Sequence, residues 1–343
     1  MDPDKPGIEG KRRHTPVLPL AGYRLSFEAR EPVGLPEYAG SAWRGIFGHA
    51  LKRTVCVTRE KDCVACLLYR SCAYPWVFET PPPEDSARMR RYRAAPHPYV
   101  LIPENRTRRT VPTGGTFDLG MNLFGRGNEY FPYIVQSFRV AGEGGIGRGK
   151  GRFALKAVRQ TALARGGETV NWREGETLSR KEPERPAVPA VPDTVRLVFE
   201  TPLRVRSADH LVGPGEFAFH HLFRNLLRRI SSLMFFHGGT PLDVDFAALV
   251  GEATTVACAS RELRWCEWTR WSSRQKTTMQ MGGLVGEISL AGSTVGPFWP
   301  YLWLGQWTHA GKGATMGLGR YRIETPDVIP AAGVGSEPGS ATG

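Results

Sequence analysis

Two stretches of the chain alternate apolar and polar residues, and a helical pattern follows each of them. Residues 23–27 and 195–199 place apolar side chains at every second position, which is typical of half-buried strands. After the first strand, Ser41 suits the N-cap of a helix that we expect to run to about Val55. After the second, residues 217–236 show an amphipathic helical pattern. Its apolar positions keep the spacing of a core-facing stripe: Phe219, Leu222, Phe223, Leu226, Leu227, Ile230, Leu233 and Met234.

A glycine-rich segment also occurs twice. Residues 145–150 and 317–322 both have the order glycine, aliphatic residue, glycine, arginine, any residue, cation. The two segments lie 172 residues apart. Residues 23–28 and 195–200 are separated by the same distance in sequence, and four of their six residues are identical. Because the two matches share one spacing, we predict two structurally similar halves.

The order of these elements predicts an α+β fold. A strand, a helix, further strands and a glycine-rich turn into a closing strand suit two tandem ferredoxin-like βαββαβ domains. Between them the chain is rich in Glu, Arg, Gly and Pro, which favours a linker. We expect a disordered basic N-terminus at 1–16, a first domain at 17–164 with a cysteine-rich insertion at 56–79, a linker at 165–192, a second domain at 193–324 with a glycine-rich loop at 309–320, and a disordered tail at 325–343.

The charge of the chain points to a nucleic-acid partner. The net charge is +12, the isoelectric point is about 9.7, and arginines cluster at 88–93, 106–109 and 264–274. In the last cluster tryptophans alternate with the cations, a pairing that suits single-stranded nucleic acid. The alternative is a solvated basic surface. No apolar run approaches the roughly 18 residues of a membrane span, and residues 1–16 lack the apolar core of a signal peptide, so we expect no membrane partner and a cytoplasmic protein.

Four of the six cysteines crowd into one segment, at Cys56, Cys63, Cys66 and Cys72. The middle pair has the Cys-x2-Cys spacing of a chelating unit, and the flanking thiols would complete a tetrahedral site. Because disulfides are disfavoured in the cytosol, we expect a structural zinc, with an iron–sulfur cluster or four plain thiols as alternatives. Such a site would leave no open coordination position for an activated water, so we expect it to be structural and not catalytic.

Several of these segments resemble the CRISPR-associated RAMP superfamily, and within it the endoribonucleases that process precursor CRISPR RNA. The likeness rests on residues 309–322, on residues 38–51, and on Cys63 and Cys66 with the following Phe78-Glu79, and it covers about residues 20–324. It implies metal-independent cleavage within the CRISPR repeat, in which a 2′-OH attacks the scissile phosphate and leaves a 2′,3′-cyclic phosphate and a 5′-OH. It also implies repeat RNA and the mature CRISPR RNA as partners, together with other subunits of an effector complex. A non-catalytic RNA-binding subunit and an unrelated zinc-stabilised nucleic-acid-binding protein are the alternatives.

His49 is the predicted catalytic histidine, from the resemblance and from its place on the first helix. At 100° per residue it points away from the apolar face of that helix, and histidine is a side chain that can act as an acid or a base in catalysis. Lys52 follows one turn later, and Tyr38 precedes the helix. We predict both as supporting catalytic residues, with packing at the start of the helix as the alternative for Tyr38. The alternative for His49 is an exposed histidine with no catalytic or binding function.

The glycine-rich loop is the predicted contact to the RNA backbone. Glycines allow close approach of backbone N–H groups to a phosphate, and a strand pattern follows the loop, which argues against a nucleotide cofactor motif. A turn that packs one domain against the other is the alternative. The predicted RNA-binding residues are His309, Gly311, Lys312, Gly313, Gly317, Gly319, Arg320, Arg270, Arg274 and Lys276.

Overall fold

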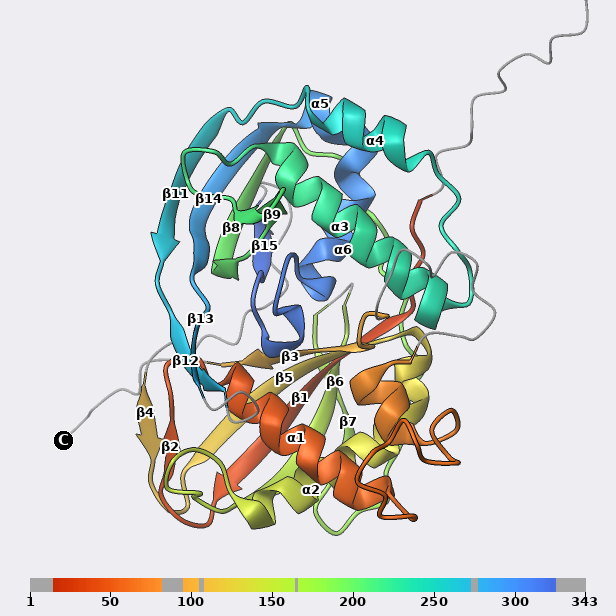
Figure 1. Ribbon diagram of the computed structural model, residues 1–343, viewed down its shortest axis with the longest axis vertical. Coiled ribbons are helices and arrows are strands. Elements are labelled where there is room, and N and C mark those ends of the chain that lie inside the picture. Colours follow the sequence, from red (N-terminus) through yellow and green to blue (C-terminus); the bar gives the residue numbers. More distant parts are fainter. Residues whose placement is uncertain (1–14, 82–94, 105–107, 164–165, 273–276, 325–343) are drawn as a thin grey trace, which may run out of the picture.

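The computed structural model shows two α+β domains stacked end to end (Figure 1). It describes residues 15–81, 95–104, 108–163, 166–272 and 277–324, with the side chains of residues 270–278 left out. The predicted disordered ends therefore lie almost wholly outside the described residues. In the part of the chain that is described, no helix combines the length and the apolar character needed to cross a bilayer.

The first domain is a ferredoxin-like unit. Its sheet has the order β3-β5-β1-β6-β7, and each neighbouring pair is antiparallel. Helices α1 and α2 cover one face of this sheet (Figure 1). The main elements are β1 (Leu20–Ala29), α1 (Gly40–Val55), β3 (Tyr99–Pro103), β5 (Thr116–Phe124), α2 (Phe131–Gly144), β6 (Phe153–Thr161) and β7 (Glu168–Arg173), with a short pair β2 (Val33–Leu35) and β4 (Arg109–Val111) and the turns η1 (Pro75–Glu79) and η3 (Gly125–Tyr130).

The second domain repeats this topology with the sheet order β11-β14-β8-β15, again antiparallel. A ribbon of β12 (Thr269–Ser272) and β13 (Thr277–Gln280) extends the β11–β14 hairpin. The other elements are β8 (Thr194–Leu203), β9 (Arg206–Ser207), β10 (His210–Leu211), α3 (Phe219–Leu233), η4 (Met234–Gly238), α4 (Phe246–Ala253), β11 (Ser260–Cys266), β14 (Gly283–Ala291), α5 (Gly292–Val295), η5 (Gly296–Phe298), α6 (Trp299–Thr308), η6 (Ala314–Met316) and β15 (Tyr321–Glu324). The predicted tandem α+β plan is confirmed.

One predicted boundary is wrong. Part of the expected linker, Glu168–Arg173, forms strand β7 at the edge of the first sheet. Trp172 anchors it, because its side chain is buried against the core while the Arg139 guanidinium lies 5.5 Å from its ring centre. The Glu- and Gly-rich flanks of this strand concealed a run of β-forming residues.

The hydrophobic cores explain how the halves are joined. The predicted stripe of α3 is buried, and the core around it also takes in Leu20, Val100 and Phe124 from the first domain. The side chains on the other face of those first-domain strands pack beneath α1 and α2. The first sheet therefore contributes to both cores, and the domains share a continuous apolar interface.

A glycine at the start of α1 allows a close backbone approach between the domains. A Cβ on Gly40 would lie 1.9 Å from the Met316 carbonyl oxygen in the glycine-rich loop. We expect Gly40→Ala to lower the free energy of unfolding by about 1–3 kcal/mol, because a backbone atom cannot move aside as a side chain can. Gly45→Ala is the control, since Gly45 is exposed on the same helix with nothing near its Cβ position, and alanine there should stabilise by up to about 1 kcal/mol. Urea unfolding of both variants measures the contrast, and equal stabilities would contradict this interface.

Candidate functional site

Helix α1 presents His49 to solvent. Trp43, Phe47, Ala50 and Leu51 are buried on its inner face, whereas His49 is exposed on the outer one. The expectation that His49 is not a core residue is confirmed. It lies nine residues after Gly40, so it sits about 13 Å along the axis from the start of the helix.

The structure does not bring Tyr38 to His49. The Tyr38 ring packs 4.5 Å from the ring of Trp268 in the second domain, and its hydroxyl lies 3.3 Å from the Cys266 sulfur. Tyr38 therefore joins the two domains before α1 begins. Packing at the start of the helix, the alternative, is observed, and the predicted catalytic role of Tyr38 stays a prediction.

Lys52 also turns away from His49. Its ammonium donates a hydrogen bond to the carbonyl of Lys61 at 3.1 Å and lies 5.7 Å from the centre of the Tyr74 ring. Both contacts belong to the cysteine-rich segment. The Lys52 side chain thus makes these contacts with this segment, because a one-turn spacing places two Cα atoms together without fixing where a long side chain points. Its predicted catalytic role stays a prediction.

The glycine-rich loop is chiefly an interdomain turn. Gly311, Gly313, Gly317 and Gly319 all have positive φ, between 66° and 88°, which explains why glycine occupies each position. Several of its N–H groups are already used: the N–H of Lys312 donates to the Arg204 carbonyl at 2.9 Å, and that of Gly319 to the Pro202 carbonyl at 3.0 Å. The loop is thus held by strand β8, and most of its backbone cannot cradle a phosphate.

The predicted RNA-binding residues separate into accessible and inaccessible groups. Gly311, Lys312 and Gly313 reach the surface and remain candidates. His309, Gly317 and Gly319 are buried, so a contact with RNA is excluded for them in this structure. Arg320 forms an ion pair with Glu200 at 2.7 Å. The side chain of Arg270, together with Arg274 and Lys276, lies outside the described residues.

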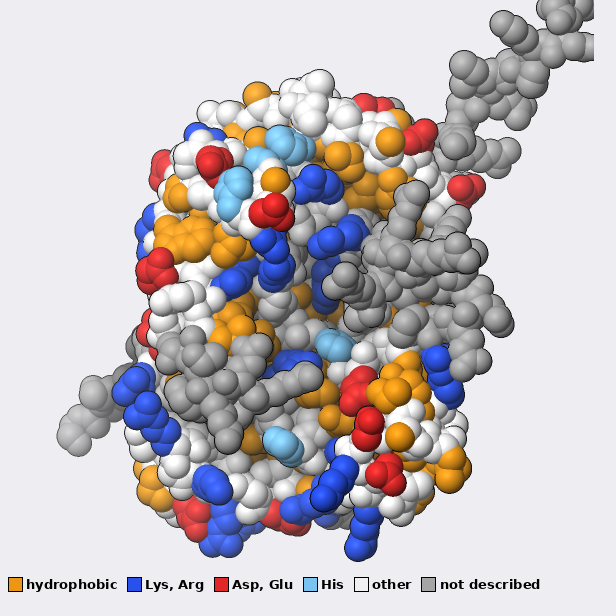
Figure 2. Space-filling view, viewed as in Figure 1, with side chains coloured by type: hydrophobic (Ala, Val, Ile, Leu, Met, Phe, Trp, Pro, Cys, Tyr) orange, Lys and Arg blue, Asp and Glu red, His pale blue; other side chains and the backbone are white. Residues whose placement is uncertain are grey.

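A group of cations that the sequence patterns did not predict surrounds Lys312, and we call it the basic cluster: Arg206, Arg224, Arg228 and Lys312. Partial burial first, and then repulsion by Arg206, Arg204 and Arg228, lower the pKa of Lys312. None of the four forms an ion pair with a carboxylate of the described residues. Figure 2 shows cations gathered over this part of the second domain, beside the hollow between the domains. The four-residue spacing of Arg224 and Arg228, opposite the apolar stripe of α3, was the available sequence signal.

The interdomain histidines are poor proton carriers. His237 and His309 are fully buried, and His97 is half-buried beside the Arg44 guanidinium at 3.4 Å. Burial, assisted by the positive charge of Arg44, lowers the pKa of His97 to about 3, and burial lowers that of His237 to about 4. Burial also lowers the pKa of His309 far below its ordinary value. All three rings are therefore neutral at neutral pH and serve the interface.

His49 differs from the remaining described histidines. His210 is bonded to Glu216 at 3.0 Å, and the ring of His220 packs against His221, 4.1 Å away between centres. The Nδ1 of His221 accepts a bond from the N–H before the start of α3, so it caps that helix. Among the histidines in the described ranges, His49 is the exposed one whose ring makes no hydrogen bond or ion pair.

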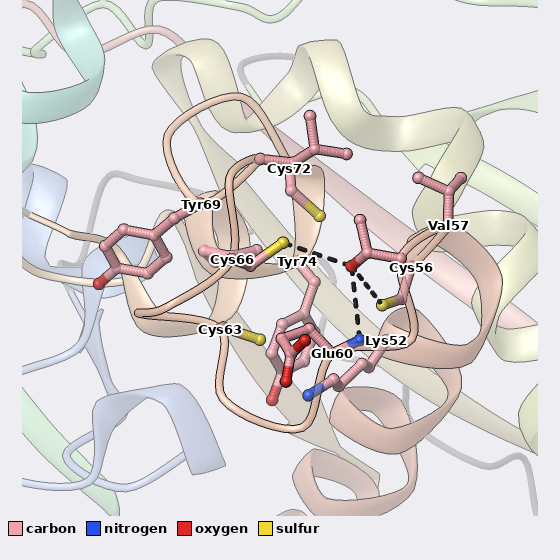
Figure 3. Close-up of a pocket in the computed structure, with 12 residues that line it drawn as sticks. Lys52, Cys56, Val57, Glu60, Cys63, Cys66, Tyr69, Cys72 and Tyr74 are labelled. Atoms are coloured by element: carbon pink, nitrogen blue, oxygen red, sulfur yellow. Dashed lines mark hydrogen bonds between the residues drawn. The ribbon is translucent and has the colours of Figure 1, made fainter.

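The four cysteines of the predicted metal site do come together. Cys56, Cys63, Cys66 and Cys72 line one cavity beside the C-terminal end of α1, and their sulfurs point into it (Figure 3). No group of three or more potential ligands among the described side chains is arranged closely enough to hold an ion. The gathering of the thiols agrees with the expectation, and the metal itself stays a proposal.

Comparison with known proteins assigns the two halves separately. Residues 18–184 match a family of N-terminal domains, and residues 197–321 match the family of the CRISPR-associated endoribonuclease Cas6. A curated but uncharacterised protein of Archaeoglobus fulgidus is 31% identical over 113 residues, which is 33% of this chain and 37% of that protein. The chain thus matches little more than a third of the length of that relative.

Solved structures show the same fold over nearly the whole chain. A Cas6 product complex superposes with a TM-score of 0.53 at 16% identity, covering 91% of this chain and 99% of that one. A partial Cas6-RT-Cas1–Cas2 complex superposes with a TM-score of 0.52 at 12% identity, covering 93% of this chain and 48% of that one. The second half of the chain therefore contains a domain of the family of the CRISPR-associated endoribonuclease Cas6, and the fold of solved Cas6 structures extends over both halves.

Proposed function

We propose that this protein cleaves precursor CRISPR RNA within the repeat without a catalytic metal. The Cas6 domain gives the reaction class, and a structural neighbour was captured as a Cas6 product complex. The observation that carries the assignment to a site is His49, which is exposed on the helix that meets the glycine-rich loop and has no bonded partner among the described residues. An exposed imidazole can exchange protons with RNA near neutral pH.

The proposed chemistry needs one proton to leave the nucleophile. His49 takes the proton of the 2′-OH upstream of the scissile phosphate. The 2′ oxygen then attacks the phosphorus atom. The bond from phosphorus to the 5′ oxygen breaks, and that oxygen gains a proton from water or from the histidine. The products are a 2′,3′-cyclic phosphate and a 5′-OH.

The basic cluster is proposed to hold the RNA. Arg206 comes from β9, Arg224 and Arg228 come from α3, and Lys312 belongs to the glycine-rich loop that meets α1. Cations without carboxylate partners bind phosphates and release counterions. If these interactions persist after cleavage, the protein retains the cleaved RNA. Other CRISPR proteins are the proposed partners of this protein–RNA complex.

A non-catalytic RNA-binding subunit is the second candidate. The observation that favours it is the separation of Tyr38 and Lys52 from His49, which leaves the histidine without the predicted helpers. Such a subunit would bind repeat RNA tightly, with an affinity that falls as salt rises, and would release no fragments.

Cleavage in the presence of a chelator tests the choice between the two. We expect purified protein to cut end-labelled repeat RNA from the neighbouring array at the same single-turnover rate with EDTA as with magnesium. The control is a scrambled RNA of equal length, which should stay intact. Binding of the repeat without cleavage in either buffer would favour the scaffold, and cleavage that EDTA stops would overturn the metal-independent reaction.

A further inference from the structure

We propose that Cys56, Cys63, Cys66 and Cys72 hold a structural zinc ion that fastens the cysteine-rich segment to α1. The proposal does not depend on RNA cleavage, because it concerns what stabilises residues 56–80. It starts from the cavity shown in Figure 3, into which all four sulfurs point. All four are free thiols, and each side chain is half-buried.

The thiols come from three consecutive turns of chain. Cys56 caps the C-terminal end of α1, with its N–H bonded to the Lys52 carbonyl at 2.9 Å. The middle pair lies in a tight turn, in which the Cys66 N–H bonds to the Cys63 carbonyl at 3.2 Å. Cys72 ends the next turn, just before η1. Four ligands delivered by a short stretch in this way are typical of structural zinc sites.

The loop of this segment between α1 and η1 has little apolar support of its own. Between α1 and η1 it forms neither helix nor strand apart from a short lead-in to η1, and its aliphatic side chains point outward, since Val57 is 78% exposed, Val64 67% and Leu67 87%. A segment without a hydrophobic core needs a covalent or metal link to hold one conformation. The structure describes all of its cysteines as free thiols, which leaves the metal.

A hydroxyl now lies between two of the sulfurs. The Thr58 oxygen is 3.3 Å from the Cys66 sulfur and 3.9 Å from the Cys56 sulfur. Tetrathiolate zinc needs sulfurs about 2.3 Å from a common centre, so the site must contract around the ion. Rotation of cysteine side chains that already share the cavity, with Thr58 moving out, would suffice for that change.

Nearby cations suit the charge of the loaded site. Zinc with four thiolates carries two negative charges, and the Lys52 side chain lines the same cavity. Arg59, Lys61 and Arg70 also belong to the segment. A lysine beside coordinated sulfur would stabilise the thiolates as an outer-shell partner.

The site would also support the helix that carries His49. The segment continues into η1, where the Phe78 ring packs so close to Gly48 that a Cβ there would lie 2.4 Å from the ring. The Arg44 guanidinium lies 4.3 Å from the centre of the same ring. The segment therefore contacts α1 at two places. One is the C-terminal end of the helix, at Cys56, and the other is the middle of the helix, beside His49.

Elemental analysis of the full chain, purified without chelator, tests the proposal. We expect about one zinc per chain, little iron, and loss of the zinc in the double variant Cys63→Ser, Cys66→Ser. The matched control is Cys258→Ser, a half-buried thiol elsewhere in the chain, which should keep its zinc. Removing zinc with a strong chelator should lower the melting temperature of the wild type and leave that of the double variant unchanged.

A second readout on the wild type covers the case of a double variant that fails to fold. Cobalt added to the metal-free protein should give the charge-transfer absorption of tetrahedral thiolate coordination, and four of the six thiols should resist a thiol reagent until the metal is removed. Zinc far below one per chain, zinc retained by the double variant, or iron with acid-labile sulfide would each overturn the proposal. Zinc content is measured without RNA, so its result is independent of whether the protein cleaves.

Discussion

Replacement of His49 by alanine is expected to slow cleavage of repeat RNA by about 10²–10⁴-fold, the usual contribution of a positioned general acid or base. The side chain is exposed and makes no hydrogen bond or ion pair with the described residues, so its removal should leave the fold and the RNA affinity nearly unchanged. The rate under single-turnover conditions and the dissociation constant from anisotropy separate these two quantities.

His210 supplies the matched control for this substitution. It is exposed on the second domain and bonded to Glu216, away from α1, and His210→Ala should cleave like the wild type. Undiminished cleavage by His49→Ala would exclude the proposed base. An equal loss of rate in both variants would show that the effect is not specific to α1.

Removal of two cations from the basic cluster is expected to weaken RNA binding at least about tenfold, because each charged hydrogen bond to a phosphate contributes roughly 1.5–3 kcal/mol. The variant is Lys312→Ala with Arg228→Ala. The plot of log affinity against log salt should also become shallower, by about 0.7 in slope for each cation removed from single-stranded RNA. Anisotropy titrations of a labelled repeat at several salt concentrations measure both effects.

Arg173→Ala with Lys181→Ala is the control of equal charge. Both side chains are exposed in the first domain, Arg173 at the end of β7 and Lys181 in the segment after it. Their loss should leave the slope unchanged. If the two double variants lose the same affinity, binding depends on net charge alone and the basic cluster is not the interface.

Local patterns predicted the elements well because each pattern reports burial within its own domain. The stripe of α3 and the inner face of α1 are buried as expected, and the shared spacing of the two glycine segments reflects two copies of one topology. Periodicity together with the repeated spacing therefore sufficed for the tandem fold, and periodicity sufficed for the outward direction of His49.

Interactions between the domains could not be predicted in that way. Tyr38, His309 and Gly317 look like solvent-facing or loop residues in sequence, yet each is covered by residues that lie far away along the chain. The same limit applied to the basic cluster, since strand β9, helix α3 and the loop bring its members together only after folding. Side-chain direction was the other limit, because spacing placed Lys52 near His49 while its hydrogen bond directs it to the cysteine-rich segment.

Mass spectrometry of the two fragments formed from repeat RNA in EDTA tests the proposed reaction most directly. The masses should correspond to a 2′,3′-cyclic phosphate on the upstream fragment and a 5′-OH on the downstream one, with both fragments absent when His49→Ala replaces the wild type over the same time. Fragments with a 3′-OH and a 5′-phosphate, or the same fragments at the same rate from His49→Ala, would contradict it.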